Sequence, residues 1–239
     1  AHQPVYLPWL GLFHKIALAD HFCVFDVAQY QTKDFNNRNK IKTNAGAIWL
    51  TVPVESKGHF EKQISTVRII NNGWNRKHLK SIELAYKKAP FFDEYFPPLE
   101  ALLQREFTLL TDLNTQMLEL LLRQLGIDVP ISLATALGLE GKKSDLVLDM
   151  CLKLGASEYV FGAQGRNYAN IENFLGRGVR PHFQSYVHPV YKQLHGAFEP
   201  YMSVIDLLYN TGPSSLSILM SGNLKELKQI PPPEPPLRA

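Results

Sequence analysis

The stretch AHQPVYLPWLG, residues 1–11, decides how the N-terminal part of the chain folds. Pro4 and Pro8 each disfavour helix for the residue before them, so we expect an extended loop after a strand that ends at His2. After Gly11, apolar residues recur at helical spacing, which predicts a helix. The chain therefore begins as strand, loop and helix, with a rigid polar and aromatic loop directly after the strand.

Outward from this stretch, strand and helix patterns alternate. The predicted strands are His21–Phe25, Ile48–Val54, Ile64–Ile70, Glu158–Phe161 and Val179–Tyr186. The predicted helices start near Trp74, Asp112, Ser144, Ile171 and Ser203, with Asp112, Ser144 and Ser203 as caps and Gly126 as a C-terminal glycine. This alternation predicts an α/β, Rossmann-like fold with a mainly parallel sheet covered by helices.

The chain is expected to form one domain over residues 1–225, with a helical insertion at about 73–126. The residues from 226 to 239 are rich in proline and are expected to form a disordered tail. Cys23 and Cys151 lie in apolar stretches, so we expect buried, reduced thiols in a cytoplasmic protein. No apolar run approaches the ~20 residues that span a bilayer, and we recognise no signal peptide.

Positive charge is concentrated between Gln31 and Pro90, where twelve Lys and Arg face four Asp and Glu, while the whole chain carries only +3. This asymmetry indicates either an anionic small-molecule ligand or a solvated helix face with basic loops. We find no nucleic-acid-binding motif, no serine-hydrolase or metalloprotease motif and no dinucleotide fingerprint, and the sequence identifies no cofactor.

Ligands of parallel α/β sheets bind beyond the carboxyl ends of the strands, which directs attention to the loops after His2, Phe25, Phe161 and Tyr186. His2 is a candidate acid, base or phosphate donor. The remaining candidates in its loop are Gln3, Tyr6 and Trp9, whose side chains would wall a pocket. The alternative is a rigid turn whose aromatic rings only plug the end of the sheet.

Two basic segments are candidate anion sites. In Gln29–Lys42, the side chains of Arg38 and Lys42 are placed to clamp a carboxylate or phosphate, and a mobile polar loop is the alternative. Lys77 lies in the first turn of a predicted helix, where a cation is locally unfavourable unless an anion is bound. An exposed basic turn is the alternative reading for Lys77.

His188 follows a predicted strand and precedes a proline, so it is the second acid or base candidate, with a structural histidine as the alternative. With His182 and His195 it invites a metal interpretation, but the spacing is wrong and no acidic residue is near in sequence, so we expect no metal site. Asp206 is either a site wall or a hydrogen-bonded packing residue of its helix.

Six successive segments resemble the signatures of the WbqC-like protein family. They are residues 2–11, residues 26–30, residues 37–42, Lys77-His78-Leu79, His188-Pro189-Val190-Tyr191 and residues 203–208. One departure is Phe25 before Asp26, where the family pattern has a pair of aspartates, so a role needing two carboxylates there is in doubt. The opening is also loosely similar to nucleotidyltransferase-like folds, although their His-x-Gly-His motif is missing.

The resemblance implies a bacterial protein of O-antigen or surface-polysaccharide synthesis, an acyl- or aminoacyltransferase acting on a nucleotide-linked amino sugar. In that reaction His2 or His188 would take the proton, and Arg38, Lys42 and Lys77 would hold the anion. Tyr191 or Asn39 would orient the acyl group, and Gln29 and Asp206 complete the expected substrate site. The alternatives are nucleotidyl transfer with Mg²⁺, or a non-catalytic partner that docks an acyl carrier protein or a biosynthetic complex.

Overall fold

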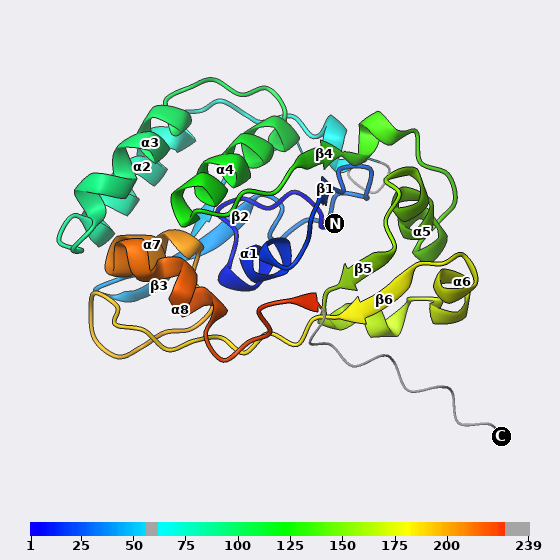
Figure 1. Ribbon diagram of the computed structural model, residues 1–239. Helices are drawn as coiled ribbons and strands as arrows, with labels where there is room; N and C mark the ends of the chain where they lie inside the picture. Colours follow the sequence, from blue (N-terminus) through cyan, green and yellow to red (C-terminus); the bar gives the residue numbers. More distant parts are fainter. Residues whose placement is uncertain (56–61, 228–239) are drawn as a thin grey trace.

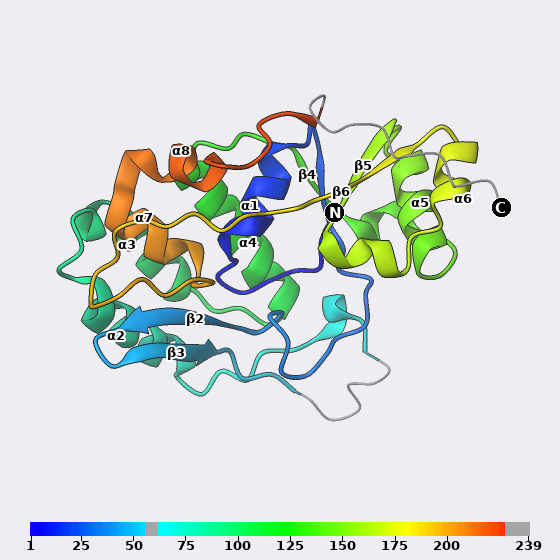
Figure 2. The same ribbon diagram turned by 90° about the horizontal axis from the view of Figure 1, so that it is seen from below.

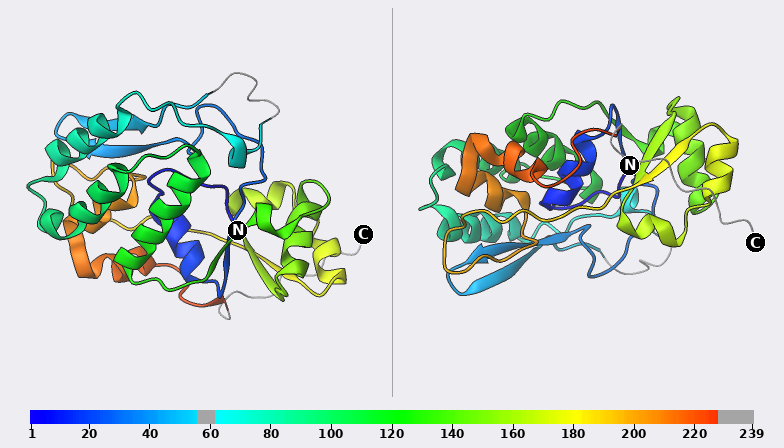
Figure 3. Two further views of the ribbon diagram at one scale, coloured as in Figure 1. Left: turned by 90° about the horizontal axis from the view of Figure 1, so that it is seen from above. Right: turned by 60° about the horizontal axis from the view of Figure 1, so that its bottom comes forward.

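The structure of the protein is a computed structural model that describes residues 1–55 and 62–227. It has a larger part, which contains helices α1–α4, α7 and α8, and a smaller part around α5, α6, β5 and β6 (Figure 1). The N-terminus lies where the two parts meet, as the views from above and from the lower side also show (Figure 3). The expected proline-rich tail lies almost entirely outside the described residues.

The helices are α1 (Leu10–Ala17), α2 (Trp74–Tyr86), α3 (Phe92–Leu103), α4 (Leu110–Leu125), α5 (Ser144–Lys153), α6 (Ile171–Gly176), α7 (Val204–Thr211) and α8 (Ser215–Met220). The strands are β1 (Phe22–Val24), β2 (Arg38–Thr43), β3 (Gly46–Thr51), β4 (Ile131–Leu133), β5 (Glu158–Phe161) and β6 (Arg180–Phe183). Short 3₁₀ turns follow β4 and β5, at Ala134–Leu137 and Ala163–Asn167.

The class is mixed α/β, as predicted, and two strand pairs are parallel: β1 with β4, and β5 with β6. The described strands nevertheless form three separate two-stranded sheets instead of one mainly parallel sheet. The parallel strands are only three or four residues long. The two longest strands, β2 and β3, pair with each other as an antiparallel hairpin. The strand predicted at Ile48–Val54 corresponds to β3, but β2 and the antiparallel pairing were not predicted.

Local sequence signals were right where a backbone requirement was strict. The helix from Trp74 is confirmed, Gly126 ends α4 in the left-handed region at φ 72°, and the Ser203 side chain caps α7 by accepting from the Ile205 N–H. The caps predicted at Asp112 and Ser144 are wrong, since both residues lie inside the first helical turn.

Two stretches of the prediction fail for the same physical reason. Ile64–Ile70 was expected to be a strand, but it begins with a 3₁₀ turn and then makes only isolated bridges to Val54 and Leu109. Helix α3, which contains Pro97 and Pro98, lies inside the helical insertion predicted at about 73–126, but it was not predicted as a separate helix. In both stretches tertiary packing overrides the local preference of the residues.

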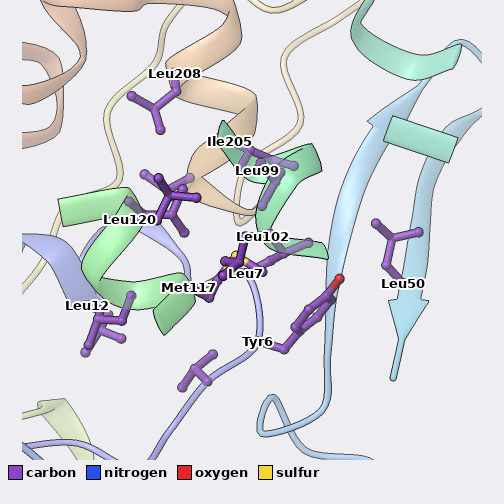
Figure 4. Close-up of a cluster of buried hydrophobic side chains, with 14 of the residues drawn as sticks. Tyr6, Leu7, Leu12, Leu50, Leu99, Leu102, Met117, Leu120, Ile205 and Leu208 are labelled. Carbon is purple, nitrogen blue, oxygen red and sulfur yellow. The ribbon is translucent and has the colours of Figure 1, made fainter. Parts of the chain in front are cut away.

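Two hydrophobic cores hold the parts together. The larger core packs the N-terminal loop against α4, α7 and the β2–β3 hairpin, with Tyr6, Leu7 and Met117 all fully buried (Figure 4). The smaller core lies under α5, β5 and α6 and contains Cys23 and Cys151, which are free, buried thiols as predicted. No described helix has both the length and the apolar character that crossing a bilayer requires.

We expect Met117→Ala to lower the free energy of unfolding by about 2–5 kcal/mol, because Met117 is 0% exposed and its removal leaves a cavity in the larger core. Urea denaturation followed by circular dichroism measures the change. Leu84→Ala, at a side chain that is 60% exposed, is the control and should change stability by less than about 0.5 kcal/mol. Equal losses in the two variants would contradict this placement of the core.

Candidate functional site

A cavity of about 790 Å³ lies at the junction of the two parts. Its walls come from the N-terminal loop, α1, residues 25–36, the start of α5, the turn after β5 and the segment after β6. Of the residues that the sequence singled out, the cavity brings together His2, Gln3, Trp9 and His188. Four loops that the strand-end rule selected therefore meet in space, although the strands β1, β5 and β6 that precede three of them belong to two separate short pairs.

His2 is held as a neutral imidazole at the cavity wall. Its Nδ1 lies 2.9 Å from the carbonyl oxygen of Gln3, so the proton is on Nδ1 and Nε2 keeps its lone pair. The ring meets Trp9 edge-on, with ring centroids 5.3 Å apart. Burial, together with the nearby Lys15 cation, lowers the pKa of His2 to about 3, so it remains unprotonated at neutral pH.

Lys15 is the cavity residue that sequence reasoning missed. It lies on α1, is only 5% exposed, and donates from Nζ to the carbonyl oxygen of Ala1 at 2.7 Å. Among the described residues no carboxylate lies within ion-pair distance of it. Burial lowers the pKa of Lys15 to about 8, so roughly a tenth of the amine is uncharged at pH 7 and about half at pH 8. The apolar spacing that predicted helix α1 does not indicate that Lys15 is buried beside the N-terminal loop.

The segment from Gln184 to Met202, here called the strap, connects β6 with α7 and passes beneath α1 (Figure 2). It carries Tyr186 and His188 to the cavity. Gly11 allows this close approach, since a Cβ there would lie 3.0 Å from the Tyr186 ring and 3.1 Å from Trp9 Nε1. Gln184 fixes the start of the strap by donating to the carbonyl oxygen of Gly11 at 2.8 Å.

His188 uses both ring nitrogens within the strap. Nδ1 lies 2.8 Å from the carbonyl oxygen of Pro189, and Nε2 accepts from the Tyr201 N–H at 3.3 Å. Burial lowers the pKa of His188 below that of a free histidine, although the Pro189 carbonyl and the Asp206 carboxylate oppose the shift. His188 is therefore also neutral, but its Nε2 is less available than that of His2.

The middle of the strap is held by the buried carboxylate of Asp206, which is 0% exposed. Tyr86 donates to one of its oxygens at 2.9 Å, and Tyr191 and Gln193 donate to the other, each at 2.8 Å. Lys42 donates to Gln193 Oε1 at 3.0 Å and also to the carbonyl oxygen of Ala197. Burial raises the pKa of Asp206, and the hydrogen bonds from Tyr191, Tyr86 and Gln193 oppose this rise.

The other predicted site residues do not line the cavity, and most of them make contacts within the protein. Tyr6 lies 2.9 Å from His78 in the larger core, and Asn39 donates to the carbonyl oxygen of Leu7. Lys42, Tyr191 and Asp206 belong to the network under the strap and do not line the cavity. Gln29 pairs with Gln63, Lys77 is exposed on α2, and Arg38 stacks on Trp49. Asp26, at the family departure, binds Thr135 through both carboxylate oxygens.

The three histidines of the metal interpretation are dispersed. His182 is buried and pairs with Glu158 at 3.1 Å, while His195 contacts the carbonyl oxygen of Ala85 and only His188 lines the cavity. No group of three or more metal-ligating side chains gathers anywhere in residues 1–55 and 62–227.

The fold and the cavity define an α/β protein with a site of small-molecule size, whose wall includes two neutral imidazoles and one buried amine. Residues 3–218 match the WbqC-like protein family, and the chain belongs to this family. It is 35% identical over 212 residues to the uncharacterized protein Rv1507c of Mycobacterium tuberculosis, which covers 88% of this chain and 92% of the mycobacterial one. No solved structure matches the chain.

The buried amine makes stability depend on pH. Because folding lowers the pKa of Lys15 from 10.5 to about 8, the unfolded chain binds more protons between these values, and stability rises with pH across that window. Relative to Lys15→Met, the wild type should gain about 1–2 kcal/mol of unfolding free energy between pH 8 and 9.5. Urea denaturation at several pH values measures this difference.

The control for this experiment is Lys88→Met, which removes one positive charge from an exposed position. Its stability difference from the wild type should stay constant over the same pH range. A constant difference for Lys15→Met as well would show that the Lys15 amine is solvated.

Removing one donor from Asp206 should loosen the strap. We expect Tyr191→Phe to cost about 1–3 kcal/mol, because a buried carboxylate oxygen loses a hydrogen bond that water does not replace. Tyr201→Phe is the control, since that side chain is 66% exposed and should tolerate the change. Chemical denaturation measures both variants, and a Tyr191→Phe protein as stable as the control would rule out a structural role for this hydrogen bond.

Proposed function

We propose that the protein transfers an acyl or aminoacyl group to the amine of a nucleotide-linked amino sugar during O-antigen or other surface-polysaccharide synthesis. The acceptor and the bacterial, cytoplasmic setting come from the family resemblance. The chemistry rests on one observation: a single cavity contains a neutral imidazole with an available Nε2 and a buried amine of lowered pKa.

The size and the walls of the cavity suit such an acceptor. A volume of about 790 Å³ lies within the range of about 300–1,000 Å³ that small-molecule sites occupy. Aromatic side chains of Trp9, Phe35, Tyr159, Tyr168 and Tyr186 contribute much of the wall. Rings of this kind pack against the apolar faces of a sugar, while the amides of Gln3 and Gln164 offer hydrogen bonds to its hydroxyls.

Acyl transfer to an amine needs a proton acceptor. The amine nitrogen attacks the acyl carbonyl carbon, a C–N bond forms, the bond to the leaving group breaks, and the nitrogen loses one proton. A base must be unprotonated at working pH to take this proton. His2 is unprotonated at neutral pH, and its Nδ1 is already committed to the Gln3 carbonyl, so Nε2 can accept the proton. Because an imidazole with a pKa of about 3 is a weak base, this role requires the bound substrate to raise that pKa, as negative charge beside the Lys15 ammonium would do. Asp34 is the one carboxylate among the described residues that line the cavity. The cavity wall therefore carries little negative charge that would repel the diphosphate of a nucleotide sugar.

We assign the proton acceptor to His2 and a supporting role to His188. The Nε2 of His188 is turned toward the Tyr201 N–H, so its ring supports the strap wall. Lys15 supplies positive charge or a neutral amine close to His2, depending on pH. Burial raises the pKa of Tyr159 well above its ordinary value, so this phenol remains a neutral wall residue that can donate to a developing oxyanion.

The test is an acyl-transfer assay with nucleotide-linked amino sugars as acceptors. Acyl thioesters, including acyl carrier proteins, and aminoacyl donors are supplied in turn, and mass spectrometry detects the acylated acceptor. We expect product with the wild type and a loss of about 10²–10⁴-fold in kcat for His2→Gln. His21→Gln, which changes an exposed histidine bound to Ser132, is the matched control and should keep full activity.

Three results would contradict the proposal. Absence of any acylated product across the donor panel would remove the transferase function. Full activity of His2→Gln would show that His2 is not the base, although the transferase function would be retained. A loss in His188→Gln larger than in His2→Gln would transfer the role of base to the strap histidine.

A further inference from the structure

A line of aromatic rings leads from the cavity to the protein surface. His2 meets Trp9 at 5.3 Å between ring centroids, Trp9 meets Phe35 at 5.4 Å, and Phe35 meets Trp49 at 5.8 Å. The first three rings line the cavity, while Phe35 and Trp49 are 39% and 41% exposed. The cavity therefore continues at its mouth into an exposed aromatic surface on the β2–β3 hairpin.

Two cations lie on the outermost ring. The Arg38 guanidinium carbon is 4.3 Å from the centroid of the Trp49 ring, and Lys40 Nζ is 5.2 Å from it. Lys40 and Trp49 are direct cross-strand partners, and Arg38 projects from the same face of β2 because side chains alternate along a strand. The indole thus holds both cations beside Phe35, the ring through which Trp49 contacts the cavity wall.

These charges lack an acidic partner in the part of the chain that the structure describes. Neither Arg38 nor Lys40 has a carboxylate within ion-pair distance. Arg38 donates one terminal N–H to the Lys33 carbonyl, and its buried Nε has no hydrogen-bond partner. Asp34, the nearest acid in sequence, accepts from the Phe35 N–H at 2.7 Å.

A contact that served only the hairpin would explain part of this arrangement. An exposed cation on an indole contributes about 0.5–1 kcal/mol, and one such cation is enough for that purpose. It does not account for a second cation, for the missing counter-charge, or for the unbroken ring contacts back to His2. Uncompensated cations beside an exposed aromatic surface are the chemistry that binds an anion joined to a planar ring.

We propose that this surface, formed by Phe35, Arg38, Lys40 and Trp49 and here called the mouth platform, binds the nucleoside diphosphate half of the acceptor. The diphosphate pairs with Arg38 and Lys40, the nucleobase packs on exposed ring surface, and the sugar extends along Trp9 toward His2. This inference rests on the proposed function for the location of the reacting sugar. It adds the orientation of the substrate and the residues that select a nucleotide.

Binding without turnover tests the mouth platform. Isothermal titration calorimetry measures UDP, dTDP, uridine and inorganic pyrophosphate against the wild-type protein. We expect a nucleoside diphosphate to bind at least 10-fold more tightly than uridine or pyrophosphate, because only it engages both the rings and the cations. Its affinity should fall as salt rises, since the contact includes exposed charge pairs.

The variants separate the two parts of the platform. Arg38→Gln combined with Lys40→Gln should weaken nucleoside diphosphate binding at least 10-fold and leave uridine binding unchanged. Trp49→Leu should weaken both ligands about 5-fold or more. The matched control, Lys88→Gln combined with Arg123→Gln, removes one lysine and one arginine from exposed positions elsewhere and should change neither affinity by 2-fold. Melting temperatures verify that each variant is folded.

The outcomes distinguish this inference from the proposed function. If acyl transfer occurs but the Arg38 and Lys40 substitutions leave the affinities for UDP and dTDP unchanged, the mouth platform does not bind the diphosphate, whereas the transferase function is supported. If no acyl transfer is found but nucleoside diphosphate binding depends on Arg38 and Lys40 as expected, the mouth platform is supported and the proposed reaction is contradicted. Tighter binding of pyrophosphate alone, or of a single-stranded oligonucleotide, would overturn the proposed occupant.

Discussion

The structure depends most on the burial of one carboxylate. Asp206 has no exposure to solvent, and its two oxygens accept hydrogen bonds from Tyr86, Tyr191 and Gln193, which lie on α2 and on the strap. An isolated buried carboxylate would be very costly, so the chain must bring these donors to it. Meeting that requirement fixes the path of a strap that contains no helix or strand of its own over Gln184–Met202. The strap in turn closes one side of the cavity.

The second determinant is the position of the N-terminal loop between two hydrophobic cores. Residues such as Tyr6 and Leu7 are inserted into the larger core, while His2 and Lys15 remain at the boundary where the cavity begins. Burial without an acidic partner disfavours the charged form of a base, which lowers the pKa of both groups. The same packing that makes the loop rigid therefore keeps His2 neutral, so that its Nε2 can accept a proton, and it lowers the pKa of Lys15 towards the neutral range.

How far the sequence could predict this site depended on what each residue type reveals. Prolines, the glycine after α4 and the regular apolar spacing of α2 carry strict backbone information, and they located the loop and the helices. Polar residues carry little information on direction. Asn39, Lys42, Tyr191 and Asp206 have the side chains of a binding site, yet each spends its hydrogen bonds on the protein itself. Lys15 was missed because sequence spacing does not show which neighbouring segment covers a helix.

Strand β2 contributes cations both to the network under the strap and to the mouth platform. Its alternation puts Arg38, Lys40 and Lys42 on one face, and the strap binds the ammonium of Lys42 at one end of this face. There the ammonium is buried and used to hold the strap, whereas Arg38 and Lys40 stay on Trp49 at the other end of the face. The basic stretch that stood out in the sequence thus divides into a structural cation and two uncompensated ones. One short hairpin therefore carries both kinds of cation: Lys42 holds the strap that carries His188, while Arg38 and Lys40 form part of the mouth platform.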